Sequence, residues 1–122
     1  MKENIKILIV EDEAIVARCL SMDLEMMGFE VCEFASNGKE AIIRAIENEP
    51  NLILMDINLV GDINGIEAAR QIREHKAIPM IFMTGYSQFE INDKVKELNP
   101  ICFINKPVEV EMLKPVIDEY FA

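Results

Sequence analysis

Residues 51–58 read NLILMDIN, and this stretch decides the fold of the chain. Its apolar run Leu52–Met55 follows Pro50 closely and leads directly into a carboxylate, Asp56. A short apolar run bounded by turn residues is typical of a strand buried on both faces, as in parallel sheets. In open α/β sheets, ligands bind outside the carboxyl ends of the strands, where Asp56 would lie. A lone Asp at such a place can also serve only to cap the following turn.

The rest of the chain alternates apolar runs with segments of helical spacing. Ile5–Val10 predicts a buried strand, and Glu30–Ala35, which Glu33 interrupts, predicts a partly exposed edge strand. Two later runs, Met80–Thr84 and Ile101–Ile104, bring the number of expected strands to five. Each expected strand is followed by a stretch that favours a helix.

Apolar residues at helical spacing mark the core-facing side of each expected helix. In chain order they are Val16, Leu20, Leu24 and Met27, broadened by Ile15, Cys19 and Met26; Ala41, Ile42, Ala45 and Ile46; Ile66, Ala69 and Ile72; Ile91, Val95 and Leu98; and Met112, Leu113, Val116, Ile117 and Tyr120. Asn37 is the expected N-cap of the second helix. For Pro115 we expect a bend, or a last helix that begins late enough to hold it in the first turn.

Strand and helix alternate five times, which predicts an α/β fold with parallel strands joined by right-handed crossovers. The expected architecture is a three-layer α/β/α sandwich, a flavodoxin-like (βα)5 doubly wound sheet. Because the second strand is the least apolar, it belongs at an edge, which fits the strand order 2-1-3-4-5. At 122 residues, the chain is expected to form a single domain over residues 1–122.

Composition narrows the classes of function. A formal net charge of −10 argues against direct nucleic-acid binding, which depends on neutralising phosphates with Lys and Arg. No apolar run approaches the roughly 20 residues that span a bilayer, so we expect a cytoplasmic protein without membrane contact. Cys19, Cys32 and Cys102 are expected to be buried reduced thiols, because no CxxC or Cys-His pairing accompanies them. His75 is expected at the surface near a helix end.

The expected strand order brings polar strand ends together at one edge. Glu11, Asp12 and Asp56 would repel one another there, and two unit charges ~4 Å apart cost about 4 kcal/mol at an effective dielectric near 20. A hard divalent cation such as Mg²⁺ relieves this repulsion and prefers oxygen ligands. Lys106 adds a permanent positive charge and Thr84 a hydroxyl. Acids, a cation, an ammonium group and a hydroxyl around one carboxylate indicate phosphoryl transfer to that carboxylate.

With these residues, the chain resembles the receiver domain of two-component response regulators, the CheY-like family, over its whole length. The residues that carry the resemblance are the acidic pair in ILIVEDE (Glu11, Asp12), the acceptor in LILMDIN (Asp56), the threonine in IFMTG (Thr84) and the Lys-Pro pair in FINKP (Lys106, Pro107). Each motif alone is weak, but their order at the ends of the first, third, fourth and fifth strands is specific.

The resemblance implies a role for each matching residue. Asp56 would be the phosphoacceptor, taking a phosphoryl group from a phosphohistidine on a sensor histidine kinase or a histidine phosphotransfer protein. Asp12 and Asp56 would bind Mg²⁺, for which Mn²⁺ or Ca²⁺ can substitute. Glu11 would act on the metal largely through water, and Asn58 would supply its backbone carbonyl. Lys106 would pair with the phosphoryl group.

The resemblance also implies a conformational switch. Thr84 would move toward the phosphoryl group, and Phe103, three residues before the Lys, would swing inward; ordinary core packing is the alternative for Phe103. The bond between Lys106 and Pro107 is expected to be cis. The surface of the fourth helix, fifth strand and fifth helix would then change, to control a downstream target or output domain or to form a homodimer.

Two departures from the family pattern stand out. The loop INLVGDINGIEAA after Asp56 is one residue longer than the commonest pattern and lacks its usual proline. We therefore expect Gly61 and Asp62 to take an unusual turn, with Asp62 close enough to affect metal binding. Gly85 stands where the family most often has Ala.

Two other classes of function compete with the switch. Aspartyl-nucleophile phosphatases of the haloacid dehalogenase type use Asp, Mg²⁺, Thr and Lys, but they expect a second Asp two residues after the nucleophile, where this chain has Asn58. The second competing class is a protein-binding module that has lost phosphorylation and acts only through protein contacts. We expect no enzyme activity beyond self-phosphorylation from a donor and slow self-dephosphorylation.

Overall fold

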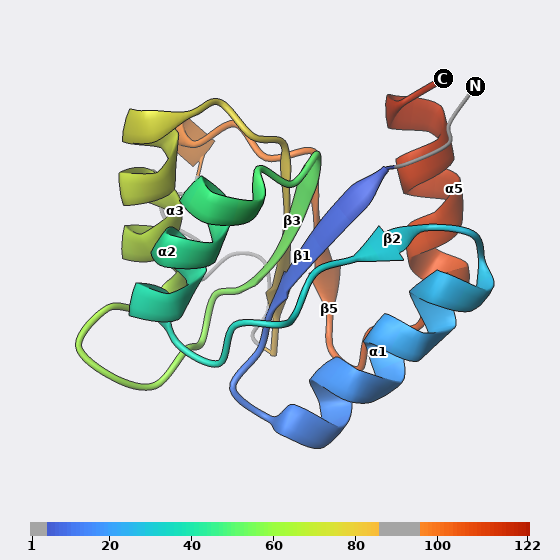
Figure 1. Ribbon diagram of the computed structural model, residues 1–122, viewed down its shortest axis with the longest axis horizontal. Helices are drawn as coiled ribbons and strands as arrows, with labels where there is room; N and C mark the ends of the chain where they lie inside the picture. The colour runs from blue at the N-terminus through green and yellow to red at the C-terminus, as the bar shows by residue number, and fades with distance from the viewer. Residues whose placement is uncertain (1–4, 86–95) are drawn as a thin grey trace.

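The computed structural model describes residues 5–85 and 96–122 (Figure 1). The elements in chain order are β1 (Lys6–Val10), α1 (Ala14–Met26), β2 (Glu30–Val31), α2 (Gly38–Asn48), β3 (Leu52–Asp56), α3 (Gly65–His75), β4 (Met80–Thr84), β5 (Cys102–Asn105) and α5 (Val110–Tyr120). The helix expected over residues 91–98 lies mostly outside the described residues.

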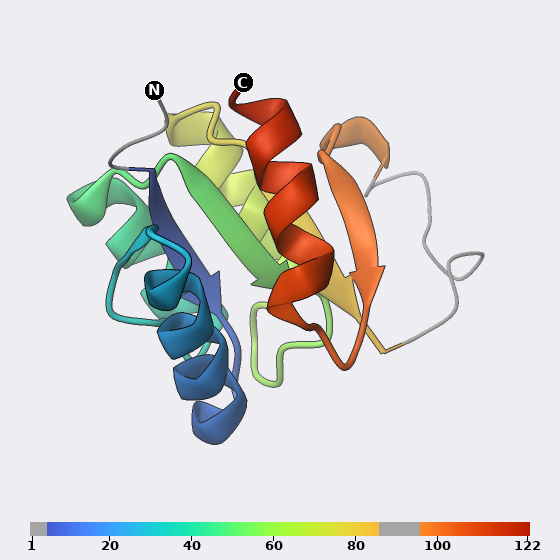
Figure 2. The same cartoon turned by 90° about the vertical axis from the view of Figure 1, so that its right-hand side faces the viewer.

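The described strands form one parallel sheet in the order β2-β1-β3-β4-β5. Helices α2 and α3 cover one face of this sheet, and α1 and α5 cover the other (Figure 1). The arrows of the central strands point the same way, so their carboxyl ends meet at one edge (Figure 2). The predicted three-layer, doubly wound fold and its strand order are confirmed.

The central strands are buried on both faces. Every residue of β3 and β4 is buried, as the continuous apolar runs predicted. Along β3, Ile53 and Met55 pack toward the cluster that includes α2 and α3, whereas Leu52 and Leu54 pack toward the cluster that includes α1 and α5. Alternate residues therefore serve opposite layers, which explains why no polar residue interrupts the run.

The helices bury narrower stripes than the sequence indicated. In α1 the buried residues are Ala17, Leu20 and Leu24, so the expectation for Leu20 and Leu24 is confirmed. The remaining residues assigned to the core in this helix are exposed: Ile15, Val16, Cys19, Met26 and Met27. Helix α1 is apolar on several sides, and its small residue Ala17, rather than Val16, is fully buried.

Similar corrections apply to the other helices. In α2, Ala41 and Ala45 are buried as expected, but Ile46 is largely exposed. In α5, Leu113 and Ile117 are buried, whereas Met112 and Tyr120 are exposed and Val110 takes a core position instead. In each helix the side chains nearest the sheet are buried, and apolar residues at the rim of the predicted stripe reach solvent.

Several local expectations were also wrong. Strand β2 comprises only Glu30–Val31, although Ala35 still donates its N–H to the Ile9 carbonyl. Pro115 lies inside α5, which begins at Val110, so the alternative that placed it in the first turn is wrong, and the bend stays a prediction. Of the cysteines, Cys19 is exposed rather than buried.

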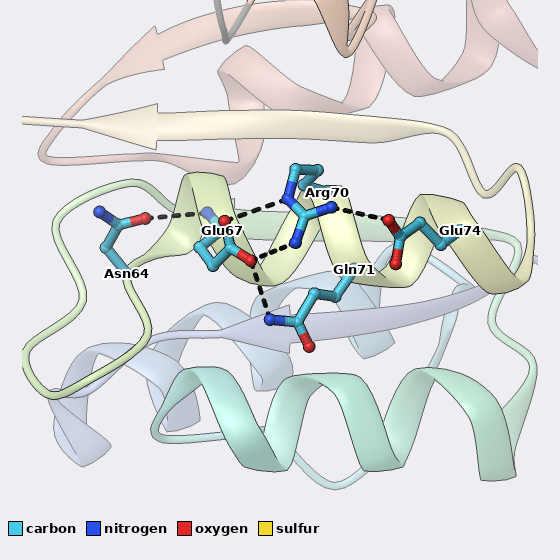
Figure 3. A network of polar contacts seen from close by, with 5 residues as sticks. All are labelled: Asn64, Glu67, Arg70, Gln71 and Glu74. Carbon is cyan, nitrogen blue, oxygen red and sulfur yellow. Dashed lines mark hydrogen bonds and ion pairs between the residues drawn. The ribbon is translucent and has the colours of Figure 1, made fainter.

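Asparagine side chains begin two of the helices. Asn37 accepts a hydrogen bond from Glu40 N–H at the start of α2, as predicted, and Asn64 accepts one from Glu67 N–H at the start of α3. From Glu67, a network of polar contacts runs along the exposed side of α3 through Arg70, Gln71 and Glu74 (Figure 3). These contacts fix the helix that directly follows the loop after Asp56.

His75 is the last residue of α3 and is exposed, as predicted. None of the helices in the described part of the chain is both long enough and apolar enough to cross a bilayer.

Candidate functional site

The ends of four consecutive strands of the sheet, β1, β3, β4 and β5, build the candidate site. Strands β1 and β3 are neighbours, and Val10 pairs with Met55, so Glu11 and Asp56 follow at the same level of the sheet. Lys106 comes directly after β5, and its N–H donates to the Thr84 carbonyl at 2.8 Å. The parallel topology therefore brings residues more than forty positions apart in sequence to one edge.

The acidic residues form a compact cluster. Glu11, Asp12 and Asp56 each offer a carboxylate oxygen, and these oxygens lie within 4.8 Å of one another. Glu11 and Asp56 are each 1% exposed, and Asp12 is the member that reaches solvent. Such buried carboxylates need compensation, because removing a charge from water without a partner costs several kcal/mol.

Lys106 supplies part of this compensation. Its Nζ donates to Asp56 Oδ2 at 2.8 Å and lies 3.4 Å from Glu11 Oε1. Two backbone N–H groups also donate to the acids: Glu13 N donates to Glu11 Oε2, and Asn58 N donates to Asp56 Oδ1 at 2.9 Å. Both oxygens of Asp56 thus have a partner, and the carboxylate is held in one orientation.

Burial and neighbouring charges shift the pKa values of two groups. Burial, together with the nearby charge of Asp56, raises the pKa of Glu11, although the Glu13 N–H and Lys106 oppose this rise. For Lys106, burial acts to lower the pKa, but the hydrogen bond and charge of Asp56, with help from Glu11, outweigh it and raise the pKa. Lys106 is therefore charged at neutral pH.

The donor set suits a hard divalent cation. Among the described residues, the cluster holds three carboxylates against one nearby ammonium group, so negative charge is in excess there at a largely buried edge. All of its side-chain donors are oxygens, which Mg²⁺ and similar ions prefer. Asp12 lies on the solvent side, where a metal can enter with bound water. The arrangement is consistent with the divalent metal site of a receiver domain.

The remaining predicted residues lie around this cluster. Thr84 is the last residue of β4, is 1% exposed and pairs with Asn105 of β5. Phe103 is half-buried and stacks on Phe82, with ring centroids 5.8 Å apart. The peptide bond between Lys106 and Pro107 is cis.

The loop after Asp56 contains features that the sequence did not indicate. A Cβ on Gly65 would lie 2.1 Å from the Asp56 carbonyl oxygen, so only glycine fits there. The Asn58 side chain accepts a hydrogen bond from Gly85 N–H. Gly61 has a positive φ of 120°, which fits the expected unusual turn, but Asp62 is exposed and is not part of the acidic cluster found among the described residues. An Asn-Gly dipeptide such as Asn64-Gly65 favours a turn in general and does not indicate this packing contact.

Comparisons with known proteins agree with this geometry. The family model of the response regulator receiver domain matches residues 7–118. The chain is 38% identical over 110 residues to the response regulator ArlR of Staphylococcus saprophyticus. The aligned region covers 88% of this chain and 48% of ArlR. It is 29% identical over 113 residues to the transcriptional regulatory protein PdtaR of Mycobacterium tuberculosis, covering 93% of this chain and 55% of that protein. The chain thus spans about half the length of these curated relatives.

Solved structures give the same result. A CheY-like receiver domain protein from Methanospirillum hungatei JF-1 superposes with a TM-score of 0.85 at 32% identity, covering 97% of this chain and 94% of the other. The signal receiver domain of a modulated diguanylate cyclase from Desulfovibrio desulfuricans G20 reaches a TM-score of 0.87 at 32% identity, covering 96% and 93% of the two chains. From its fold, its acidic pocket and these matches, the chain belongs to the response regulator receiver domains of two-component systems, the CheY-like family.

Proposed function

We propose that this receiver domain is a phosphorylation-driven signalling switch whose acceptor is Asp56. A carboxylate oxygen of Asp56 forms the new bond to phosphorus, while the bond between phosphorus and the imidazole nitrogen of a donor phosphohistidine breaks. The electron pair of that bond leaves with the imidazole. The observation that carries the proposal is the orientation of Asp56, which is 1% exposed and held by Lys106 Nζ at 2.8 Å and Asn58 N–H at 2.9 Å.

The other residues act on the charge of the transferred group. Lys106 pairs with its oxygens, and Thr84 donates a hydrogen bond to one of them. Glu11, Asp12, Asp56 and the backbone carbonyl of Asn58 would hold Mg²⁺, with Mn²⁺ or Ca²⁺ as substitutes. When bound, the metal supplies neutralising charge to the phosphoryl oxygens.

Receiver domains work with histidine kinases, and one surface here suits a protein donor. Ile15, Cys19, Met22 and Met26 recur at helical spacing on the exposed side of α1, with Ile15 78% and Met26 84% exposed. Exposed apolar patches of this kind mark protein interaction sites. Helix α1 begins two residues after Asp12, so a kinase helix or phosphotransfer domain docked there would bring its phosphohistidine close to the acceptor.

The signalling output would come from movements of Thr84 and Phe103 beside the site. We infer that phosphorylation draws Thr84 toward the phosphoryl group and moves Phe103 from its stacking contact with Phe82. The surface of the fourth helix, β5 and α5 would then change and control a downstream protein or output domain, or mediate a homodimer. Most of that fourth helix lies outside the described residues.

Incubation with acetyl phosphate and Mg²⁺, followed by intact-mass spectrometry, tests the proposal. The parent protein should gain one phosphate, and Asp56→Ala or treatment with EDTA should abolish the gain. Unchanged mass in the parent would favour a protein-binding module that has lost phosphorylation.

A true phosphatase is the remaining alternative. Receiver domains are typically phosphoacceptors rather than catalytic enzymes. Continuous turnover of p-nitrophenyl phosphate by the parent, lost in Asp56→Ala, would favour an aspartyl-nucleophile phosphatase over a switch.

A further inference from the structure

The hydrogen-bond ladder between β3 and β4 ends in an unusual way. Ile57 N–H donates to the Met83 carbonyl at 2.9 Å, and in a parallel ladder the next bond would run from Gly85 N–H to the Ile57 carbonyl. That carbonyl instead accepts from Gly65 N–H, at 3.3 Å. Gly85 N–H donates to Asn58 Oδ1 at 3.2 Å. The Asn58 side chain therefore takes the place of a backbone carbonyl as the last acceptor for β4.

The same residue also touches the acceptor carboxylate. Asn58 N–H donates to Asp56 Oδ1 at 2.9 Å, while its side chain holds the residue that directly follows Thr84. Asn58 is half-buried, so its amide lies at the boundary between the site and solvent. Asn58 thus links the acceptor, through its backbone N–H, to the first backbone donor beyond β4, through its side chain.

A phosphoryl group on Asp56 changes the competition for this donor. It carries a charge of about −1.5 to −2 and three strong acceptor oxygens. Hydrogen bonds from N–H groups to such charged oxygens are roughly twice as strong as those to a neutral amide. Nothing covalent holds Gly85 to Asn58, so the stronger acceptor can take over its N–H.

We propose that the Asn58 side chain is a positioning residue that latches Gly85 in the unphosphorylated protein, and that a phosphoryl group on Asp56 releases this latch by capturing the Gly85 N–H. The inference rests on the proposed phosphorylation of Asp56. It assigns to Asn58 a second role, separate from the backbone carbonyl that would bind the metal. Release of Gly85 frees the residue directly after Thr84 to shift, which couples chemistry at β3 to the end of β4.

Asn64 provides a matched control. It lies in the same loop and also accepts a backbone N–H through its side chain, but that N–H belongs to Glu67 of α3 and not to Gly85. Loss of Asn64 should therefore lower stability without altering the latch. A merely structural role for Asn58 predicts the same behaviour for Asn58→Ala.

Amide hydrogen exchange of ¹⁵N-labelled protein tests the latch itself. Gly85 N–H should exchange about 10-fold faster in Asn58→Ala than in the parent, at conditions where the Ile57 N–H is unchanged. Asn58→Asp, which keeps an acceptor oxygen at the same place, should retain slow exchange, and so should Asn64→Ala. Equal Gly85 exchange in Asn58→Ala and the parent would overturn the proposal.

Titration with beryllofluoride and Mg²⁺, a phosphoryl mimic, tests the release. Asn58→Ala should bind it about 2- to 13-fold more tightly than the parent, the range that one net hydrogen bond provides. In the parent, the Gly85 amide resonance should shift on binding. Tight binding by the parent with equal or weaker binding by Asn58→Ala would refute the latch but leave the switch intact. No binding by the parent, with no phosphorylation of Asp56, would refute the proposed function and the release together.

Discussion

Replacing Gly65 with alanine tests how closely the start of α3 packs against the acceptor strand. The new Cβ would lie 2.1 Å from the Asp56 carbonyl oxygen and 2.9 Å from the Ile57 Cα. Ordinary contacts begin near 3.4 Å, so the two backbone segments must separate by about 1.3 Å. Both contacts are with backbone atoms, so no flexible side chain can move aside to relieve them.

The expected cost has two parts. Overpacking of this kind typically costs about 1–3 kcal/mol, whereas alanine in a helix is up to about 1 kcal/mol better than glycine. We therefore expect Gly65→Ala to lower the free energy of unfolding by about 1–2 kcal/mol, measured by urea denaturation. Because the displaced group is the backbone of Asp56, the rate of phosphorylation by acetyl phosphate should also fall, by up to about 100-fold for a 1 Å misplacement.

Gly61→Ala is the matched control for this variant. Gly61 lies in the same loop with a φ of 120°, but nothing lies within 4 Å of the position that an added methyl group would take. Backbone strain should cost it about 1–3 kcal/mol while the phosphorylation rate stays within about twofold of the parent. Parent-like stability and rate in Gly65→Ala would refute the reasoning, as would an equal loss of rate in both variants.

Three further predictions concern charged groups. In urea denaturation, Lys106→Met should lower the free energy of unfolding by about 1–3 kcal/mol at pH 7 and by less at pH 5. The loss shrinks because Glu11, with its raised pKa, takes up a proton as the pH falls and then needs the Lys106 charge less. An equal loss at both pH values would contradict this. Mg²⁺ at one hundred times its dissociation constant should stabilise the parent by about 2.7 kcal/mol. Calorimetry should show that the affinity for Mg²⁺ falls toward pH 5, because protons compete at Glu11, and that Asp62→Asn binds Mg²⁺ as tightly as the parent. A pH-independent affinity would count against the acidic cluster as the metal site. Arg73→Met should lower the free energy of unfolding by about 1–3 kcal/mol in the same denaturation assay, because this half-buried guanidinium donates to two backbone carbonyls. Arg70→Met loses only exposed ion pairs, so it should lower the same free energy by less than about 1 kcal/mol.

The sheet could be predicted because its information is local. The run Leu52–Met55 has no polar residue because both of its faces are buried. Glu33, which is exposed just beyond β2, indicated correctly that this part of the chain lies at the edge of the sheet. Once the order was known, the polar residues after each strand had to meet at one edge. The proximity of Glu11 to Asp56 follows from this topology alone.

Helix faces and loop contacts could not be predicted in the same way. In α1, apolar residues occur on more than one side, so periodicity could not separate the buried Leu20 and Leu24 from the exposed Ile15 and Met26. The contact of Gly65 with the Asp56 carbonyl and the hydrogen bond between Asn58 and Gly85 depend on how a loop folds back on a strand, which spacing does not encode.

Mapping the phosphorylated residue shows whether Asp56 is the acceptor. After incubation with acetyl phosphate and Mg²⁺, borohydride reduces an aspartyl phosphate to homoserine, and peptide mass spectrometry then identifies the modified position. We expect homoserine at residue 56 and its absence when Mg²⁺ is chelated. Modification at Asp12 or elsewhere, or none at residue 56, would contradict it.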